Sequence, residues 1–157
     1  MCRFKGRCLA QSLSSTSQGS EVIGHYEITA HKLGSGAYSS VNLAIDREAK
    51  RQVACKTIIR RTQADIDDVL KEVELLRKLR HPNINAVYGF DSSGDNLHIF
   101  LELATGGDLF SYMAKYGSLG EGESRYIAFQ LMKGLQYIHR LLISHRDLKV
   151  WCPKQCK

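Results

Sequence analysis

Five short apolar runs surround one amphipathic segment, and their order constrains the fold more than any other feature. Three runs come first, at 27–33, 40–46 and 52–59, and two follow, at 86–90 and 97–103. Their alternating or β-branched residues are typical of strands, and short polar loops separate neighbours within each group. We therefore expect an α+β fold, in which one helix is inserted after the third strand of a five-stranded antiparallel sheet.

The inserted segment carries apolar residues at helical spacing, in one stripe from Ile66 to Leu79. Pro82 ends this helix, because the residue before a proline resists helical geometry.

Beyond residue 105 the pattern is helical again. Asp108 opens and Gly117 closes a short helix. Ser118 and Glu121 predict a capping box for a longer helix. The apolar stripe expected on that longer helix consists of Ile127, Ala128, Leu131, Leu135, Ile138 and Leu142.

Composition excludes several classes of protein. The chain has 157 residues, 43% of them apolar and 24% charged, which is ordinary for a globular domain. No apolar run approaches the roughly 18 residues that a membrane span needs. The net charge is +6, but the basic stretch at 47–61 contains no aromatic residue and no base-reading motif appears, which disfavours nucleic-acid binding. Five cysteines without a secretory signal fit reduced thiols in the cytosol or nucleus. Cys152 and Cys156 have no second ligand pair nearby, so we expect no zinc site.

A glycine pair, Gly34 and Gly36, lies between the first two apolar runs. Glycines let backbone amides approach phosphate oxygens closely, although hairpins also use them, so the pair alone is weak evidence. Lys56 follows inside a strand suited to burial, and a buried ammonium is costly unless it is paired. Glu72 lies beside the stripe of the inserted helix. We therefore expect Glu72 to face inward, pair with Lys56 and aim the lysine at a phosphate.

Residues 145–149, His-Arg-Asp-Leu-Lys, complete a set whose order and spacing resemble the eukaryotic protein kinases. The resemblance runs from Tyr26 to Lys149, and a lysine two residues after Asp147 resembles the serine/threonine kinases. The glycine loop and residues 106–110 look most like the calmodulin-dependent and checkpoint or meiotic group. The resemblance implies four parts, namely a disordered leader (1–24), a small ATP-binding lobe (25–104), the start of a helical lobe (105–149) and a tail outside the family pattern (150–157).

The resemblance also implies a role for single residues. The glycine loop would cover the ATP phosphates, with Ser39 where the family usually has its third glycine. Val41 and Ala54 would sandwich the adenine, and Lys56, held by Glu72, would contact the α- and β-phosphates. The implied cofactor-binding set is Leu33, Gly34, Ser35, Gly36, Ala37, Tyr38, Ser39, Ser40, Val41, Ala54, Lys56, Glu72, Leu101, Glu102, Ala104 and Asp108.

Within that set, Leu101 would be the gatekeeper beside the adenine. The main chain of Glu102 and Ala104 would hydrogen-bond the adenine edge, and Asp108 would bond the ribose. The implied catalytic residues are Asp147, which would accept the substrate proton or orient the hydroxyl, and Lys149, which would neutralise charge on the transferred phosphoryl group.

The sequence departs from the family pattern after Lys149. Cys152 stands where the family has a magnesium-binding asparagine, and no Asp-Phe-Gly follows within these residues. Phosphoryl transfer depends on positioning and on electrostatic stabilisation by metal and cations. We therefore expect a chain that binds ATP but transfers little or no phosphate to serine or threonine of proteins.

Two alternatives stay open for this chain. One is a non-catalytic interaction or regulatory fragment that competes with a full kinase for partners. The other is a mis-spliced product of a kinase gene, because a valine codon after an AAG codon for Lys149 would create an AG/GT intron boundary. In either case the apolar helix at 127–142 would invite self-association or capture by a chaperone.

Overall fold

The described part of the chain forms two compact units. The structure, a computed structural model, describes residues 20–36, 38–59, 63–92, 96–106 and 109–145, without the side chains of 63–66 and 68. The sheet unit contains the described residues up to Lys78 and those from Ala86 to Leu103. The helical unit contains 79–85 and the described residues from Ala104 onward.

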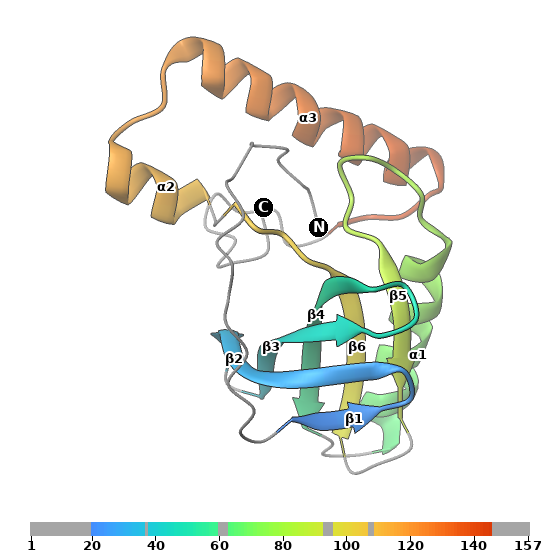
Figure 1. Ribbon diagram of the computed structural model, residues 1–157. Helices are drawn as coiled ribbons and strands as arrows, with labels where there is room; N and C mark the ends of the chain where they lie inside the picture. Colours follow the sequence, from blue (N-terminus) through green and yellow to red (C-terminus); the bar gives the residue numbers. More distant parts are fainter. Residues whose placement is uncertain (1–19, 37, 60–62, 93–95, 107–108, 146–157) are drawn as a thin grey trace. The chain divides into compact units, whose positions relative to one another are not determined.

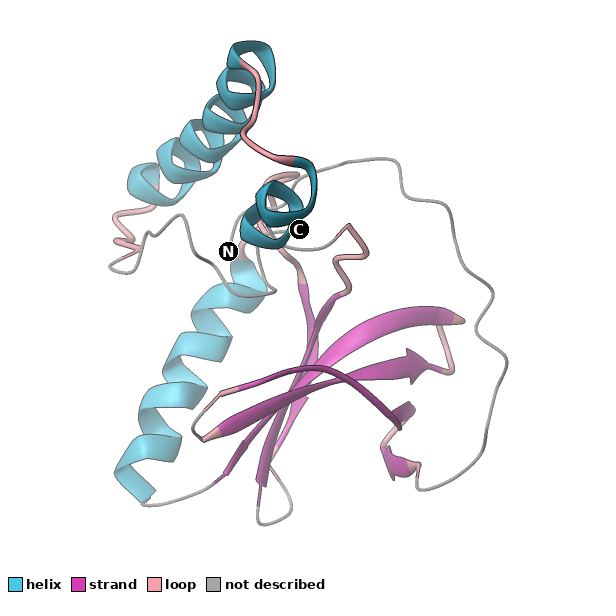
Figure 2. Cartoon of the chain, turned by 90° about the vertical axis from the view of Figure 1, so that its left-hand side faces the viewer, coloured by secondary structure: helices cyan, strands magenta, loops and turns pink. Residues whose placement is uncertain are grey.

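The sheet unit is one antiparallel sheet of six strands, in the order β1-β2-β3-β4-β6-β5 (Figure 1). Its helix α1 contacts β5 and runs along one side of the sheet (Figure 2). The elements of this unit are β1 (Glu21–Ile23), β2 (Tyr26–Ser35), β3 (Ser39–Asp46), β4 (Arg51–Ile59), α1 (Gln63–Lys78), β5 (Val87–Asp91) and β6 (Asn96–Glu102).

The five predicted strands and the inserted helix are confirmed, with ends shifted by one or two residues at most strands. The sixth strand, β1, was not predicted, and it lies within the leader that we expected to be disordered. Gly24, at φ +57°, turns the chain so that Ile23 pairs with Tyr26 and Glu21 with Ile28. Three residues are too few to show an alternating pattern, so β1 depends on pairing with β2 and on the packing of Ile23 against the core.

One face of the sheet, which we call the aromatic face, carries the main apolar core. The Tyr26 and Phe100 rings stack with their centroids 3.7 Å apart. A Cβ on Gly89 would lie 3.0 Å from the Tyr26 hydroxyl oxygen, so this glycine permits the close approach. Burial raises the pKa of Cys55 to about 11, which keeps it a thiol. The core residues of this face are Tyr26, Ile28, Ala44, Val53, Cys55 and Phe100.

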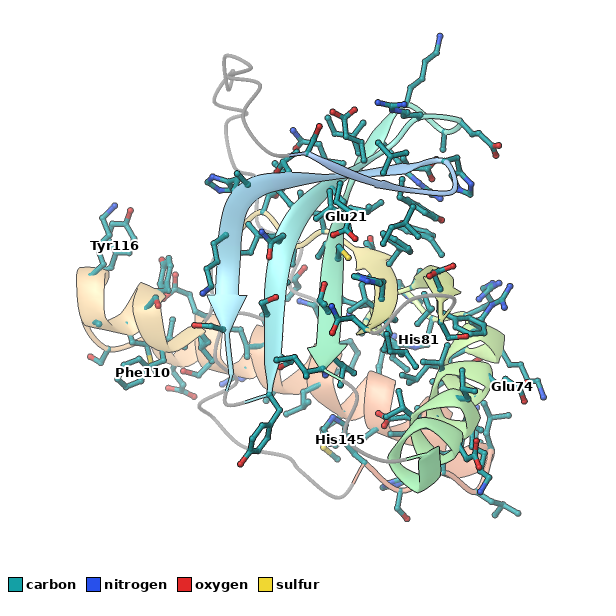
Figure 3. The ribbon with its side chains drawn as sticks, turned by 90° about the horizontal axis from the view of Figure 1, so that it is seen from below. Glu21, Glu74, His81, Phe110, Tyr116 and His145 are labelled. Atoms are coloured by element: carbon teal, nitrogen blue, oxygen red, sulfur yellow. The ribbon has the colours of Figure 1, made fainter. Side chains whose placement is uncertain are left out.

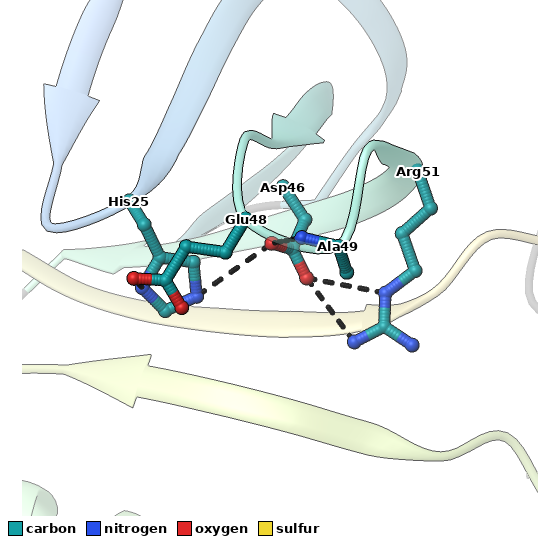
Figure 4. A network of polar contacts seen from close by, with 5 residues as sticks. All are labelled: His25, Asp46, Glu48, Ala49 and Arg51. Carbon is teal, nitrogen blue, oxygen red and sulfur yellow. Dashed lines mark hydrogen bonds and ion pairs between the residues drawn. The ribbon is translucent and has the colours of Figure 1, made fainter.

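A buried carboxylate, Asp46, ties the β3–β4 turn to the edge of this face (Figure 4). It accepts hydrogen bonds from the Ala49 amide at 2.9 Å and from Arg51 Nε at 3.1 Å, and His25 Nε2 lies 3.8 Å away. The Arg51 guanidinium also lies 3.5 Å from the centre of the Tyr88 ring. Burial acts to raise the pKa of Asp46, but the Ala49 amide and Arg51 outweigh it and hold the pKa below its usual value.

The helical unit contains α2 (Leu109–Tyr116) and α3 (Glu121–Arg140). Gly117, at φ +89°, ends α2 and donates its amide to Met113 O, as predicted. The predicted capping box is wrong by two residues. The N-cap is Gly120, and its amide donates to the Glu123 carboxylate at 3.1 Å, whereas Glu121 pairs with Arg125. Glu121 and Glu123 were both candidates for the capping glutamate. Glu121 instead forms an ion pair with Arg125, four residues later in the helix.

The segment of residues 79–85 packs against α3 within the helical unit. Its Arg80 amide donates to the Tyr137 hydroxyl at 3.0 Å, and the His81 and Tyr137 rings stack with centroids 5.0 Å apart. Asn83 Nδ2 donates to Gln130 Oε1 at 2.9 Å. Burial, aided by Lys133, lowers the pKa of His81. In the part of the chain that the structure describes, no helix is long and apolar enough to cross a membrane.

The end of α3 also differs from expectation. The predicted stripe included Leu142, but the helix ends at Arg140 and Leu142 is 94% exposed at φ +59°. The amides of Leu142 and Ile143 donate to the carbonyls of His139 and Ile138. These two bonds form a Schellman motif, in which the left-handed position usually belongs to glycine.

We expect Asp46→Asn to lower the free energy of unfolding by about 1–3 kcal/mol at pH 7, because a neutral amide loses the charge-assisted bond from Arg51. Since the folded pKa of Asp46 is depressed, this contribution is complete above about pH 4 and is lost as pH falls through the folded pKa. Urea unfolding from pH 7 to pH 3 should show the deficit shrinking. The exposed Glu48→Gln is the control, and a deficit independent of pH would contradict the assignment.

We expect Leu142→Gly to raise the free energy of unfolding by about 0.5–1 kcal/mol, because glycine relieves the left-handed strain and removes little packing. Leu141→Gly, one residue earlier at φ −90°, is the matched control and should lower stability instead. Denaturant unfolding followed by circular dichroism measures both variants. Equal effects of the two substitutions would refute the role of backbone strain.

Candidate nucleotide-binding site

The face opposite the aromatic face, which we call the site face, brings four predicted residues together. Val41 pairs with Lys56 across β3 and β4, and Ala54 pairs with Leu101 across β4 and β6. Directly paired residues of antiparallel strands project from the same face, and so do residues two apart on one strand. Lys56 and Ala54 are two apart on β4, so all four side chains share one face.

Strand register extends the four residues into two adjacent rows. The first row runs Val41, Lys56, Ile99 and the second runs Leu43, Ala54, Leu101, Val87. Leu43, Ile99 and Val87 are buried, whereas Val41, Ala54 and Lys56 are partly exposed. Leu43 and Ile99 were absent from the predicted set. Only the register reveals them, since each looks like any other buried strand residue in the sequence.

The glycine loop forms a tight turn at the end of the first row. Gly34 pairs with Val41 and Ser35 with Ser40, which brings the turn beside Val41. The Gly36 amide donates to Ser39 O at 2.7 Å and closes the turn. Tyr38 O accepts a bond from the Ile59 amide at 3.2 Å, so the turn is also attached to the end of β4.

Ser39 fills the inner side of this turn. A Cβ at Gly36 would lie 3.1 Å from Ser39 Oγ. A side chain at residue 36 would therefore require the Ser39 hydroxyl to shift by a few tenths of an ångström. The Gly36 amide is internally bonded in this conformation, so a phosphate could recruit it only by opening the Gly36–Ser39 bond.

The expected Lys56–Glu72 ion pair is not formed. Lys56 is half-buried on the site face, but Glu72 is exposed, contrary to the expectation that it faces inward. None of the ion pairs between described residues joins them. The buried side of α1 is centred on Val73, which is 1% exposed. Glu72 lies about 100° around the helix from Val73, on the flank of the stripe rather than at its centre.

The end of β6 provides the last described part of the site. Leu101 is buried in the second row. The Glu102 amide donates to Ala86 O at 2.8 Å, and the Glu102 carboxylate accepts a long bond from the Ala86 amide at 3.4 Å. The Glu102 amide is therefore already bonded within the sheet unit.

The strand register does not place the remaining predicted residues in the two rows. Leu33 is partly buried and Ser35 exposed on β2, next to the turn. Ala104 belongs to the helical unit. Ala37, Asp108, Asp147 and Lys149 lie outside the described residues. Among the residues that are described, no group of three or more histidine, cysteine, aspartate or glutamate side chains could hold a metal ion.

A sequence model of the protein kinase domain matches residues 27–151. The meiosis-specific serine/threonine-protein kinase mek1 of Schizosaccharomyces pombe is 41% identical over 128 residues, which are 80% of this chain and 28% of that protein. The serine/threonine-protein kinase RAD53 of Saccharomyces cerevisiae is 37% identical over 125 residues, 79% of this chain and 15% of that protein. The chain thus spans less than a third of these relatives.

A solved structure gives the same result for the fold. The crystal structure of Rad53 1-466 in complex with AMP-PNP matches with a TM-score of 0.71 and 36% sequence identity. The match covers 80% of this chain and 33% of that chain. The similarity therefore extends over both the sheet of strands and the first helices that follow it.

We expect a double-mutant cycle of Lys56→Met and Glu72→Gln, without nucleotide, to give a coupling energy below about 0.5 kcal/mol, because the two side chains do not touch. The control cycle of Asp46→Asn and Arg51→Met should give about 1 kcal/mol or more, since Arg51 Nη2 lies 3.1 Å from Asp46 Oδ2. Urea unfolding measures all variants. A coupling above about 1 kcal/mol between Lys56 and Glu72 would contradict the exposed position of Glu72.

Proposed function

This chain belongs to the protein kinase domain family and carries part of a serine/threonine kinase domain, and from that premise we propose that its sheet unit binds ATP. The observation that supports this most directly is the site face. Val41, Ala54, Lys56 and Leu101 share it, in adjacent rows beside a glycine turn. Apolar side chains around one ammonium suit a ligand with a flat apolar base at one end and phosphates at the other.

We propose for single residues the roles that the family resemblance implies. Val41 and Ala54 pack against the adenine, with Leu101 at the back of the base. The main chain of Glu102 and Ala104 hydrogen-bonds the adenine edge, and Asp108 bonds the ribose. Lys56 neutralises charge on the phosphates, and the backbone of the glycine turn covers them after the Gly36–Ser39 bond opens.

We propose that Glu72 pairs with Lys56 only in a bound state. In the free protein Lys56 keeps contact with water, so it needs no counter-ion. Phosphates on the site face would displace that water and make an unpaired ammonium more costly. Inward rotation of α1 would then bring Glu72 toward Lys56.

The proposed reaction of the domain is transfer of the ATP γ-phosphate to serine or threonine of proteins, with Asp147 and Lys149 in the catalytic roles. We propose that this chain performs it poorly. Magnesium takes oxygen ligands, and the asparagine position holds the soft thiol of Cys152. The residues present do not fit the metal, so no catalytic step is assigned to magnesium.

Two other proposals concern the binding partners of the chain and its cellular compartment. As a non-catalytic fragment, the chain would compete with an intact kinase for partners, and its exposed α3 residues favour self-association or a chaperone. The five cysteines suit a reducing compartment, the cytosol or the nucleus. A mis-spliced transcript stays as the alternative origin, and sequencing the messenger RNA beyond the Lys149 codon decides it.

A thermal-shift titration with AMP-PNP, with and without magnesium, tests the proposed binding. Saturating nucleotide at about 100 times the dissociation constant should stabilise the chain by about 2.7 kcal/mol. Lys56→Met should weaken binding at least tenfold. The solvent-facing Lys50→Met on the β3–β4 turn is the matched control and should bind as the unmodified chain does. No shift with the unmodified chain would refute ATP binding.

A kinase assay on the same protein tests the proposed loss of transfer. We expect turnover no higher than that of an Asp147→Asn variant. Magnesium-dependent turnover well above that variant would overturn the proposal while leaving ATP binding intact.

A further inference from the structure

His81 closes a turn within residues 79–85 through a hydrogen bond that only a neutral imidazole can accept. It lies three residues after the end of α1 (Figure 3). The Asn83 amide donates to His81 Nδ1 at 3.1 Å. A backbone N–H can only donate, so Nδ1 must present its lone pair and the proton of the neutral ring is on Nε2. An imidazolium carries protons on both nitrogens and could not accept this bond.

This turn is also attached to α3. The His81 and Tyr137 rings stack, and the Tyr137 hydroxyl accepts a bond from the Arg80 amide at 3.0 Å. Asn83 is buried, and its Nδ2 donates to Gln130 Oε1 at 2.9 Å. The bond to His81 therefore fixes the backbone of the residue whose side chain binds α3.

We propose that the protonation state of His81 controls how firmly residues 79–85 bind α3, with the neutral ring holding the segment and the protonated ring releasing it. Protonation would place a ring N–H against the Asn83 amide, so that two donors face each other and the bond is lost. The amide of a buried residue would then have no partner, which is costly. This inference concerns the helical unit and is independent of the proposed nucleotide site.

The charged groups around His81 oppose a positive charge on its ring. Lys133 of α3 acts on it as a like charge. Arg80, the preceding residue, places its guanidinium on the Leu79 carbonyl oxygen at 3.0 Å. Among the described residues no carboxylate forms an ion pair with His81. Burial, followed by the charge of Lys133, accordingly lowers the pKa of His81.

One contact acts in the opposite direction. An imidazolium stacked on Tyr137 would gain a cation–π attraction that the neutral ring lacks. His81 is partly exposed, and at such a site this attraction is smaller than the cost of an unpaired buried amide combined with repulsion from Lys133. The balance therefore favours the neutral ring while the turn is closed.

Acid should therefore release the segment. A released His81 has the ordinary pKa of about 6.5, whereas the pKa in the closed turn is lower, so the released form binds more protons. The stabilisation is complete above about pH 6.5, falls progressively below that pH, and stops falling below the pKa of the closed turn. Asp46 loses its own contribution only below about pH 4, so the two effects occupy separate pH ranges.

Hydrogen exchange of the full 157-residue chain, followed by NMR at about pH 7.5 and about pH 5, tests the proposal. Protection factors already correct for the intrinsic exchange rate at each pH. Those of the Asn83 and Arg80 amides should fall together by about fivefold or more at the lower pH. The amide of Cys55, buried in a central strand of the sheet, is the internal reference and should be unchanged.

Three variants separate protonation from packing. In His81→Asn the side-chain oxygen can accept from the amide two residues on, as in an Asx turn, but the side chain does not titrate. Protection of the Asn83 amide should then differ by less than about twofold between the two pH values. His81→Ala removes the acceptor and should lower this protection at both pH values. His139→Asn, which changes an exposed histidine on α3, is the matched control and should keep the full pH dependence.

Several outcomes would overturn the proposal. One is an Asn83 protection factor that does not change with pH in the unmodified chain, and another is an equal pH dependence in His81→Asn. A parallel fall at Cys55 would indicate global unfolding instead of release. If a variant does not fold, the ring nitrogens of the unmodified chain decide, because a neutral His81 with its proton on Nδ1 would contradict the bond from Asn83. AMP-PNP binding is measured separately, so these outcomes do not bear on the nucleotide site.

Discussion

The register between β3, β4 and β6 is the constraint on which the rest of the sheet unit depends. Side chains alternate between the two faces with a period of two, so a slip of one residue would exchange the faces completely. In the register observed, Val41, Lys56 and Ala54 share the site face, while Val53 and Cys55 lie in the opposite core. The same pairing therefore decides both the stability of the sheet and the composition of the site.

The two faces of the sheet have different roles: contacts on the aromatic face stabilise the fold, and the site face is left partly exposed. The aromatic face is filled by the stacked Tyr26 and Phe100 rings and is closed at its edge by Asp46 and Arg51. These contacts bury the apolar side chains of the aromatic face without a ligand. The site face can then leave Val41, Ala54 and Lys56 partly exposed. A ligand site of this kind requires that the stabilising contacts lie elsewhere, because a site optimised for packing would have no room for a ligand.

The positions of five strands and of α1 could be predicted from the sequence, because each segment is long enough to show the spacing of its apolar residues. β1 did not follow, because three residues carry no period and the strand forms by pairing with β2. The site residues on the sheet were predictable through motif spacing, and Leu43 and Ile99 were not, because they join the rows only through register. Glu72 was misplaced because an apolar stripe defines a direction only to within about one helical position, which is enough to turn a carboxylate from the core to solvent.

The same geometric limit applies to α3. A stripe predicted from spacing alone assigned one apolar side to this helix, yet Tyr126, Phe129 and Met132 form a second one. The segment of residues 79–85 covers one side through Tyr137 and Gln130. The other side leaves Tyr126, Phe129 and Met132 more than half exposed, and spacing alone could not reveal it, because these residues fall outside the single stripe that the sequence predicts.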